Sequence, residues 1–320
     1  LSALDAKTTV TIDATAITTL SGNSAEIAAV IAGGVTLSSN YAIGVTETTL
    51  ASATLNTLDS GTTSVIDASS VTTLTGNITD VLTSYTANTA GTISNLGNEA
   101  VTLSDTSASA ANLNTLDSAT SGTVDASTVT TLTGNIADIN TAMTSSGITK
   151  ASNVAITSTD SVSSAQLATL DAQTTGIITA TISDGTMANL ANITDANSNN
   201  ALSITVTDTS VASADLNTLD GKTSVNLNAS AITTLTGTLA DVNTAYVSSG
   251  ISNLGNETVT LSDTSVTAVN LNTLDSATSG TINASTVTTL TGNIADINTA
   301  MTSIGITKAS NVAITSTDSV

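Results

Sequence analysis

The sequence predicts a mainly β fold, a parallel β-solenoid built from tandem repeats with short helical turns between its strands. Leu113–Met143 (LNTLDSATSGTVDASTVTTLTGNIADINTAM) returns as Leu271–Met301 with only Val124→Ile and Asp125→Asn changed. Repetition at a period of roughly 50 residues is typical of solenoids and repeat arrays. The 320 residues include no Phe, Trp, Cys, His or Pro, so we expect a thin core of aliphatic side chains. Segments that alternate apolar and polar residues, such as 101–104, predict short strands.

We expect one continuous repeat array over residues 1–320. Its units begin near residues 1, 55, 113, 167, 216 and 271, and a super-repeat of 158 residues maps Val101–Val162 onto Val259–Val320. The alternative is a string of separate sandwich domains of about 54 residues, which is disfavoured because a domain of that size is marginal without disulfides or metal. Leu1 stands where a start Met would, so we expect a segment of a longer protein.

The first half of the best-preserved unit predicts a strand, a turn and a short helix. Residues 101–104 alternate and form the strand, and residues 105–109 turn the chain. Apolar residues then recur at three-residue spacing over 110–116, which predicts one or two helical turns with a Ser cap, ending near Gly122.

The second half repeats this plan. Val124 begins a short strand, Val129 and Leu132 point inward, and Gly134 with Asn135 breaks the run. The segment IADINTAM, which begins at residue 136, has helical spacing, and a further strand follows at 154–157.

Stacking of these units is expected to bury their apolar faces. Equivalent strands would lie parallel at about 4.8 Å. This places Val101, Ile204 and Val259 in one inner column and Thr102, Thr205 and Thr260 in one outer column. Exposed ends of such an array would have unpaired backbone groups and apolar surface, so we expect either end-to-end self-association or continuation of the array within a longer chain.

Charge excludes several classes of partner. The chain has 4 Lys and Arg against 25 Asp and Glu, a formal net charge of −21. Such a surface repels phosphates and anionic lipid, so neither nucleic acid nor a membrane surface is an expected partner. The longest apolar run, near Ala25, is too short to span a bilayer, so no membrane insertion is expected.

The residue types that enzymes use most are missing. Without His or Cys there is no imidazole base, no thiol nucleophile and no usual zinc site. Serine and threonine are abundant, but there is no GxSxG elbow and no phosphate-binding loop. We therefore predict that the chain is not an enzyme and has no catalytic or cofactor-binding residues.

Calcium is the one ion that the sequence makes worth weighing, because Asp residues recur in register. The candidates are Asp105, Asp117, Asp208, Asp220, Asp263 and Asp275. Stacked carboxylates about 5 Å apart repel one another unless a cation intervenes, and calcium takes oxygen ligands. The alternative is that each Asp caps a helix or a turn, which the exchange of Asp125 for Asn283 favours because Asn caps without charge.

Threonine at outer positions suggests a second binding hypothesis, in which regularly spaced hydroxyls order water at an ice surface. Thr205-Val206-Thr207 has the TxT form, but its equivalents at 102–104 and 260–262 end in Ser. A β-favouring polar residue on the wet side of a strand explains the same pattern.

The repeated strings VTLSDTS, LNTLDSATSGT and VTTLTGNIADINTA resemble the very large Thr-, Ser-, Ala- and Asp-rich tandem-repeat surface proteins of bacteria, especially the marine cyanobacterial type. The resemblance implies an extracellular or cell-surface protein of adhesin or surface-layer type. The sequence and this resemblance together predict a structural subunit of an extracellular filament, sheath or cell-surface coat. The alternatives are the spacer stalk of a large adhesin and a calcium- or ice-binding solenoid.

Overall fold

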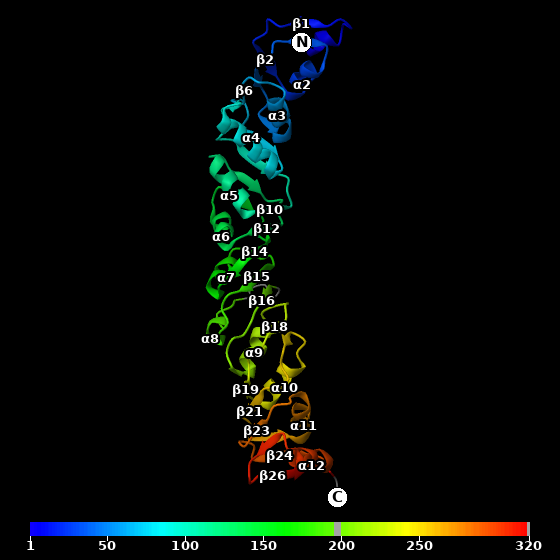
Figure 1. Ribbon diagram of the computed structural model, residues 1–320, viewed down its shortest axis with the longest axis vertical. Coiled ribbons are helices and arrows are strands. Elements are labelled where there is room, and N and C mark those ends of the chain that lie inside the picture. Colours follow the sequence, from blue (N-terminus) through cyan, green and yellow to red (C-terminus); the bar gives the residue numbers. More distant parts are fainter. Residues whose placement is uncertain (195–199, 319–320) are drawn as a thin grey trace. The chain divides into compact units, whose positions relative to one another are not determined.

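A computed structural model describes residues 1–194 and 200–318 (Figure 1). The chain forms two compact units, Leu1–Thr157 and Ser158–Val320. The helices of the first unit are α1 (Ser2–Asp5), α2 (Ser24–Ala32), α3 (Ser52–Ser60), α4 (Ile78–Ala90), α5 (Ala110–Ala119) and α6 (Ile136–Thr144). Those of the second unit are α7 (Ser164–Asp171), α8 (Met187–Leu190), α9 (Ser213–Asp220), α10 (Leu239–Val247), α11 (Ala268–Ala277) and α12 (Ile294–Thr302).

The strands are short. The first unit contains β1 (Ile12–Ala14), β2 (Thr19–Gly22), β3 (Val35–Leu37), β4 (Ala42–Val45), β5 (Thr49–Ala51), β6 (Ile66–Asp67), β7 (Thr73–Gly76), β8 (Ile93–Ser94), β9 (Ala100–Leu103), β10 (Ser107–Ser109), β11 (Val124–Ala126), β12 (Thr131–Gly134) and β13 (Ile148–Lys150). The division between the units falls within β14 (Ala155–Val162). The second unit contains β15 (Ile178–Ile182), β16 (Ala201–Ser203), β17 (Ser210–Ala212), β18 (Leu227–Asn228), β19 (Thr234–Gly237), β20 (Ile251–Ser252), β21 (Thr258–Leu261), β22 (Ser265–Thr267), β23 (Ile282–Ala284), β24 (Thr289–Gly292), β25 (Ile306–Lys308) and β26 (Ala313–Ser316).

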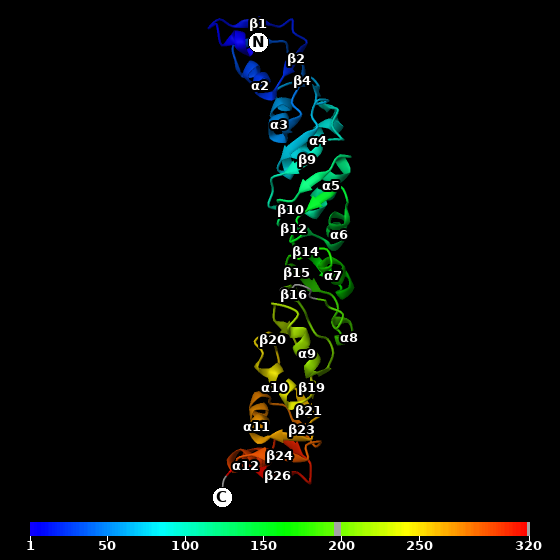
Figure 2. The same ribbon diagram turned by 180° about the vertical axis from the view of Figure 1, so that it is seen from behind.

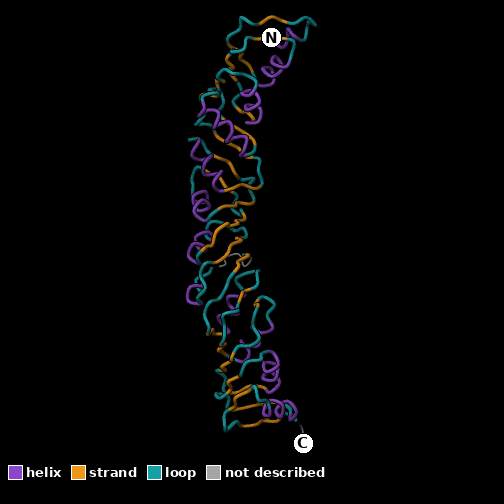
Figure 3. The backbone as a smooth tube through the Cα atoms, viewed as in Figure 1, coloured by secondary structure: helices purple, strands orange, loops and turns teal. Residues whose placement is uncertain are grey.

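The prediction of a mainly β solenoid is wrong, because the fold is α/β, with about 33% helix and 29% strand. Parallel strands cannot be joined by a tight turn, so each pairing needs a crossover, which is usually a helix. The segments expected to make one or two helical turns supply these crossovers, as in α5 and α6. Within each unit, helices lie beside short strands along the chain (Figure 3).

We use "layer" for a segment of about 24 residues that contributes short strands followed by a helix. In the first unit β5, β7, β9, β11 and β13 form one parallel sheet, β2, β4, β6 and β8 another, and β10 pairs with β12. In the second unit the orders are β17-β19-β21-β23-β25 and β22-β24-β26, with β18 paired to β20. Helices of successive layers contact one another, as α5 and α6 do beside β10 and β12 (Figures 1 and 2).

Local signals in the sequence identified most elements of the best-preserved copy. Ser109 caps α5, because its hydroxyl accepts from the amide of Asn112 at 3.2 Å. Asn135 caps α6 in the same way, because its Oδ1 accepts from the amide of Asp138 at 2.9 Å. Val129 and Leu132 are buried, as expected. The turn expected at 105–109 is partly wrong, because its last three residues form β10.

The inner column contains different residues from those expected. Val101 is buried, as are Ile204 and Val259, but its sheet neighbours are Leu74 and Val124. Paired strands thus come from successive layers, which are about half as long as the sequence repeat. Residues that are neighbours in a sheet therefore do not occupy the same position of the repeat. Thr102 and Thr205 are exposed, as expected, and Thr260 is half-buried.

Among the described residues, none of the helices combines the length and the apolar character that crossing a bilayer requires.

Candidate functional site

Three of the calcium candidates, Asp105, Asp208 and Asp263, bind the start of a helix in the preceding layer. Asp263 Oδ2 accepts from the backbone amide of Leu239, the first residue of α10, at 2.7 Å. The other two contacts of this kind join Asp105 to Ile78 at 2.8 Å and Asp208 to Met187 at 2.6 Å. Each carboxylate thus satisfies an orphan helical amide and lies at the positive end of a helix dipole.

The other three candidates, Asp117, Asp220 and Asp275, close a second kind of contact at the ends of helices. The hydroxyl of Ser248 donates to Asp220 Oδ2 at 2.6 Å, and the amide of Gly250 donates to the Ser248 hydroxyl at 3.0 Å. A Cβ on Gly250 would overlap the Asp220 carboxylate, so the carboxylate can hold this position only beside glycine. We call this arrangement the Asp–Ser–Gly clasp; the other copies are Asp117–Ser145–Gly147 and Asp275–Ser303–Gly305.

A lysine accompanies one clasp in the first unit. Lys150 Nζ donates to the carbonyl oxygens of Ser145 at 2.8 Å and Ile148 at 3.0 Å. Burial lowers the pKa of Lys150, and the nearby Asp117 carboxylate partly opposes this. The ammonium thus donates to two main-chain carbonyls beside the clasp.

The six candidate aspartates thus fall into two separate sets of contacts between layers. In the described ranges 1–194 and 200–318, there is no group of three or more acidic side chains suited to holding a metal ion. What the arrangement provides chemically is hydrogen-bond acceptors that hold one layer to the next.

Asp125 and its counterpart Asn283 make the local turns that their exchange suggested. Asp125 Oδ1 accepts from the amide of Ser127 at 3.0 Å, and Asn283 Oδ1 accepts from that of Ser285 at 3.1 Å. The hydrogen bonds to Ser127 lower the pKa of Asp125. Either side chain makes the same turn, since the acceptor oxygen and not the charge is what the turn needs.

Side-chain amides add a further contact between helices, which the sequence analysis missed. Asn217 Nδ2 on α9 donates to the carbonyl of Asp241 in the first turn of α10, at 2.9 Å. Asn56, Asn114 and Asn272, the same position of other LNTLD segments, donate to Asp80, Asp138 and Asp296. The Asn that recurs at 56, 114, 217 and 272 was the available signal, but its partner lies 24 residues away.

A buried tyrosine–glutamate pair was also missed. Glu99 is fully buried, and its Oε2 accepts from the Tyr85 hydroxyl at 3.2 Å and from the Gly97 amide at 2.8 Å. Burial is the main cause that raises the pKa of Tyr85; a hydrogen bond with Thr120 opposes it and Glu99 reinforces it. The second copy joins Tyr246, Gly255 and Glu257. The string SNLGNE, at 94–99 and 252–257, was the signal in the sequence.

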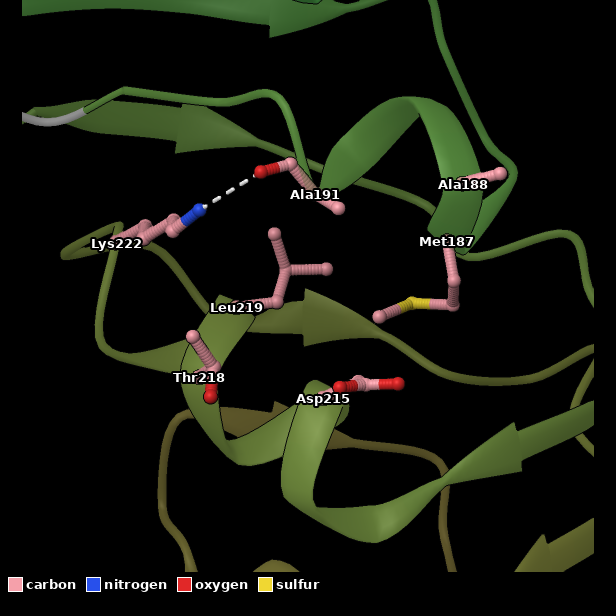
Figure 4. A pocket seen from close by; sticks show the side chains of 7 residues that line it. All are labelled: Met187, Ala188, Ala191, Asp215, Thr218, Leu219 and Lys222. Carbon is pink, nitrogen blue, oxygen red and sulfur yellow. Dashed lines mark hydrogen bonds between the residues drawn. The ribbon is translucent and has the colours of Figure 1, made fainter.

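A groove lies between α8 and α9 (Figure 4). Its volume is about 290 Å³, and Met187, Ala191 and Leu219 give it an apolar lining. Asp215 lines another part, and Lys222 Nζ donates to the carbonyls of Ile193 at 2.7 Å and Ala191 at 3.3 Å. Helix α8, on one side of the groove, has four residues, and α9, on the other side, has eight.

The last described layer, which includes α12 and β26, has large apolar side chains that no other described layer covers. We call it the C-terminal face and define it by Ile294, Met301, Ile304 and Ile314, all exposed. The strands β25 and β26 are the last strands of their sheets in the described part of the chain. A further layer, of this chain or of another copy, would bury such side chains and pair with such strand edges.

No protein-family model matches the chain, and neither the curated proteins nor the solved structures contain a significant match.

Proposed function

We propose that this chain is a structural subunit of an extracellular filament, sheath or cell-surface coat, assembled through association between layers of neighbouring copies. The proposal gives the chain a mechanical role and no catalytic one, in keeping with the absence of His and Cys. Its extracellular placement is based on the resemblance of the repeated strings to bacterial surface proteins.

The observation that carries the proposal is a contrast within the second unit. Leu239, which opens α10, is 4% exposed, whereas Ile294, which opens α12, is 63% exposed. Leu290 in the middle strand β24 is 2% exposed, whereas Ile314 in the edge strand β26 is 48% exposed. The α10 layer is covered by the α11 layer, so equivalent apolar positions become buried when a layer of this type packs on them.

The energetic argument follows from the same residues. Burying one large aliphatic side chain contributes roughly 1.5–3 kcal/mol, and several are available on the C-terminal face. Two strand edges add backbone hydrogen bonds that water would otherwise take. The net charge of −21 on each copy opposes association, and salt screens this repulsion beyond about 10 Å at 0.1 M.

Sedimentation velocity and electron microscopy of the purified chain test the proposal. We expect concentration-dependent self-association that strengthens with NaCl between low and 0.5 M, since screening removes the main opposing force. Association should persist in a calcium chelator, because the candidate aspartates are engaged in hydrogen bonds within the protein. A monodisperse monomer in every buffer would contradict assembly and favour a spacer stalk instead.

A matched pair of variants locates the surface. Ile314→Glu adds a charge on the C-terminal face, whereas Val269→Glu adds the same charge at a comparably exposed valine of α11. We expect Ile314→Glu to weaken association at least tenfold, about 1.4 kcal/mol, and Val269→Glu to leave it nearly unchanged. Equal effects of both variants would mean that only net charge matters and would remove the C-terminal face from the proposal.

A further inference from the structure

A second groove lies inside the first unit, between the end of α2 with β3 and the turn that follows α3. Its volume is about 330 Å³. The lining combines the half-buried aliphatic side chains of Ile31, Val35 and Leu37 with hydroxyl-bearing side chains such as Ser39 and Thr63. Helix α1 and β1 precede these elements and α4 follows them, so the groove lies between two inner layers.

Tyr41, which lines this groove, occupies a position that other layers fill differently. Ser-Asn-Tyr-Ala-Ile at 39–43 matches Ser-Asn-Val-Ala-Ile at 152–156, where Val154 is 3% exposed. Glu99 stands at the same place in its layer, since it directly precedes β9 as Tyr41 precedes β4. The position is thus filled by a buried aliphatic side chain, by a carboxylate with hydrogen bonds inside the protein, or by Tyr41.

The hydroxyl of Tyr41 is not used by the protein itself. Tyr41 is 5% exposed, yet within residues 1–194 and 200–318 no group makes a hydrogen bond to its hydroxyl. The Tyr85 hydroxyl, in contrast, donates to Glu99. Burial raises the pKa of Tyr41, so its hydroxyl is neutral at ordinary pH and can both donate and accept. The groove therefore contains a hydrogen-bonding group that lacks a partner in the protein.

The turn that covers this position is more open at Tyr41 than at Glu99. The Thr120 hydroxyl donates to the carbonyl of Glu99 at 2.7 Å, and Thr120 is buried. The corresponding Thr62 hydroxyl donates to the carbonyl of Tyr41 at 3.4 Å, and Thr62 is only half-buried. The same turn thus closes over the glutamate and leaves space beside the tyrosine.

We propose that this groove binds a neutral sugar residue. The Tyr41 hydroxyl hydrogen-bonds to a sugar hydroxyl, and Ile31, Val35 and Leu37 contact the C–H groups of the sugar ring. A few polar groups beside an apolar lining are typical of small-molecule sites, and a sugar combines hydroxyl and C–H groups in one compact unit. A purely apolar ligand would bury the Tyr41 hydroxyl without a partner, which is unfavourable.

The absence of charge in the groove decides the class of sugar. Among the described residues that line it, none has a charged side chain. It therefore has no cation to hold a carboxylate or a phosphate and no carboxylate to hold an ammonium group. The net charge of −21 also repels anionic ligands. This inference goes beyond the proposed function, because binding in the groove does not need assembly.

Titration of the isotopically labelled full chain, followed by NMR, tests the proposal. The probes are the methyl glycosides of glucose, galactose and mannose. We expect at least one of them to shift the backbone amides of residues 38–41 and 60–64, with a Kd in the millimolar range. The amides of residues 96–99 and 119–122 are an internal control and should not shift, because Glu99 and Thr120 already satisfy each other there.

Tyr41→Phe keeps the ring and removes the hydroxyl. We expect it to weaken binding of the glycoside about three- to tenfold, the effect of one hydrogen bond. Its thermal unfolding should match that of the parent chain, because the hydroxyl has no partner in the protein. Tyr85→Phe is the matched control: it removes a hydroxyl that donates to Glu99, so it should unfold at a lower temperature but bind the glycoside as the parent chain does.

A charged analogue and a polymer complete the test. Methyl glucuronide should bind at least about tenfold more weakly than the neutral glycoside, because no cation lines the groove. Shifts with the corresponding neutral polysaccharide would assign the ligand to units within a polymer, and shifts with the glycoside alone would assign it to a free or terminal sugar; both support the proposal. No shift with any of the three glycosides, unchanged affinity in Tyr41→Phe, or equal binding of the glucuronide would each overturn it.

Discussion

Helices α10 and α8 in the second unit begin alike and end differently. Asp263 caps the first amide of α10, and Asp208 caps that of α8 in the same way, at 2.7 and 2.6 Å. Beyond the first turn the two diverge, since α10 continues for nine residues and α8 for four.

The difference lies in the contacts that follow the cap. Between α9 and α10, Asn217 donates to the carbonyl of Asp241, and Asp220 forms its clasp with Ser248 and Gly250. Between α8 and α9, Lys222 instead donates to the carbonyls that follow α8, and the groove of about 290 Å³ remains. The two helices therefore share the Asp cap and differ in the contacts to α9, which for α10 are the Asn217 amide and the Asp220 clasp.

The largest expected loss of stability comes from adding a methyl group at the glycine of the clasp. Gly250→Ala places a methyl group where the Asp220 carboxylate lies, so we expect a loss of about 2 kcal/mol in the free energy of unfolding. Urea unfolding followed by circular dichroism measures it.

Gly221→Ala is the matched control. Gly221 has φ −67°, and an added Cβ would meet its nearest atom at an ordinary 3.6 Å. We expect it to be neutral or stabilising by up to about 1 kcal/mol. The double variant Asp220→Ala/Gly250→Ala should lose less than the sum of its parts, because the overlap is removed. Additive losses would mean that the clasp does not constrain Gly250.

A smaller effect is expected from removing the shared caps. Asp263→Ala and Asp208→Ala each leave one helical amide without its acceptor, at a cost of about 1 kcal/mol. Amide hydrogen exchange at residues 239–242 and 187–190 reports each loss locally. Asp215→Ala, at an exposed position in the first turn of α9, is the control and should change exchange by no more than about 0.5 kcal/mol. Unequal losses would show that the Asp263 and Asp208 caps do not stabilise their helices alike.

Much of the secondary structure could be predicted from the sequence because it depends on near neighbours. The cap at Ser109, the break at Gly134 and Asn135, and the inward side chains of Val129 and Leu132 all follow from local spacing. The predicted fold class was wrong because short apolar spacings do not show how long the intervening helices are. In most layers a helix of eight or more residues joins two parallel strands.

The roles of the aspartates were harder to predict, because their partners are distant in the sequence. The exchange of Asp125 for Asn283 predicts that such side chains act as caps. It does not predict the partner, since Asp105 caps a helix that begins 27 residues earlier. The exposed Ile294 and the buried Leu239 occupy equivalent positions, so the sequence alone cannot distinguish a covered layer from an open one.

The smallest expected effect concerns the charge of a cap in the same unit. Asp184 Oδ2 accepts from the amide of Ser164, the first residue of α7, at 2.7 Å. This hydrogen bond is the main cause that lowers the pKa of Asp184, and burial opposes it slightly. A folded-state pKa below the unfolded value of about 3.9 means that the cap contributes stability above that pH and loses it as pH falls through the folded pKa.

A carboxyl titration by NMR should therefore give Asp184 a midpoint below 3.9, the ordinary value. Asp184→Asn keeps the acceptor oxygen and removes the charge, so its stability should decline less than that of the parent chain between pH 5 and pH 3. The parent-minus-variant difference is needed because protonation of other carboxyls reduces the net charge of −21 over the same range and relieves repulsion in both proteins. A midpoint at or above 4 would show that the Ser164 amide does not favour the carboxylate, and the cap would then work as a neutral hydrogen bond.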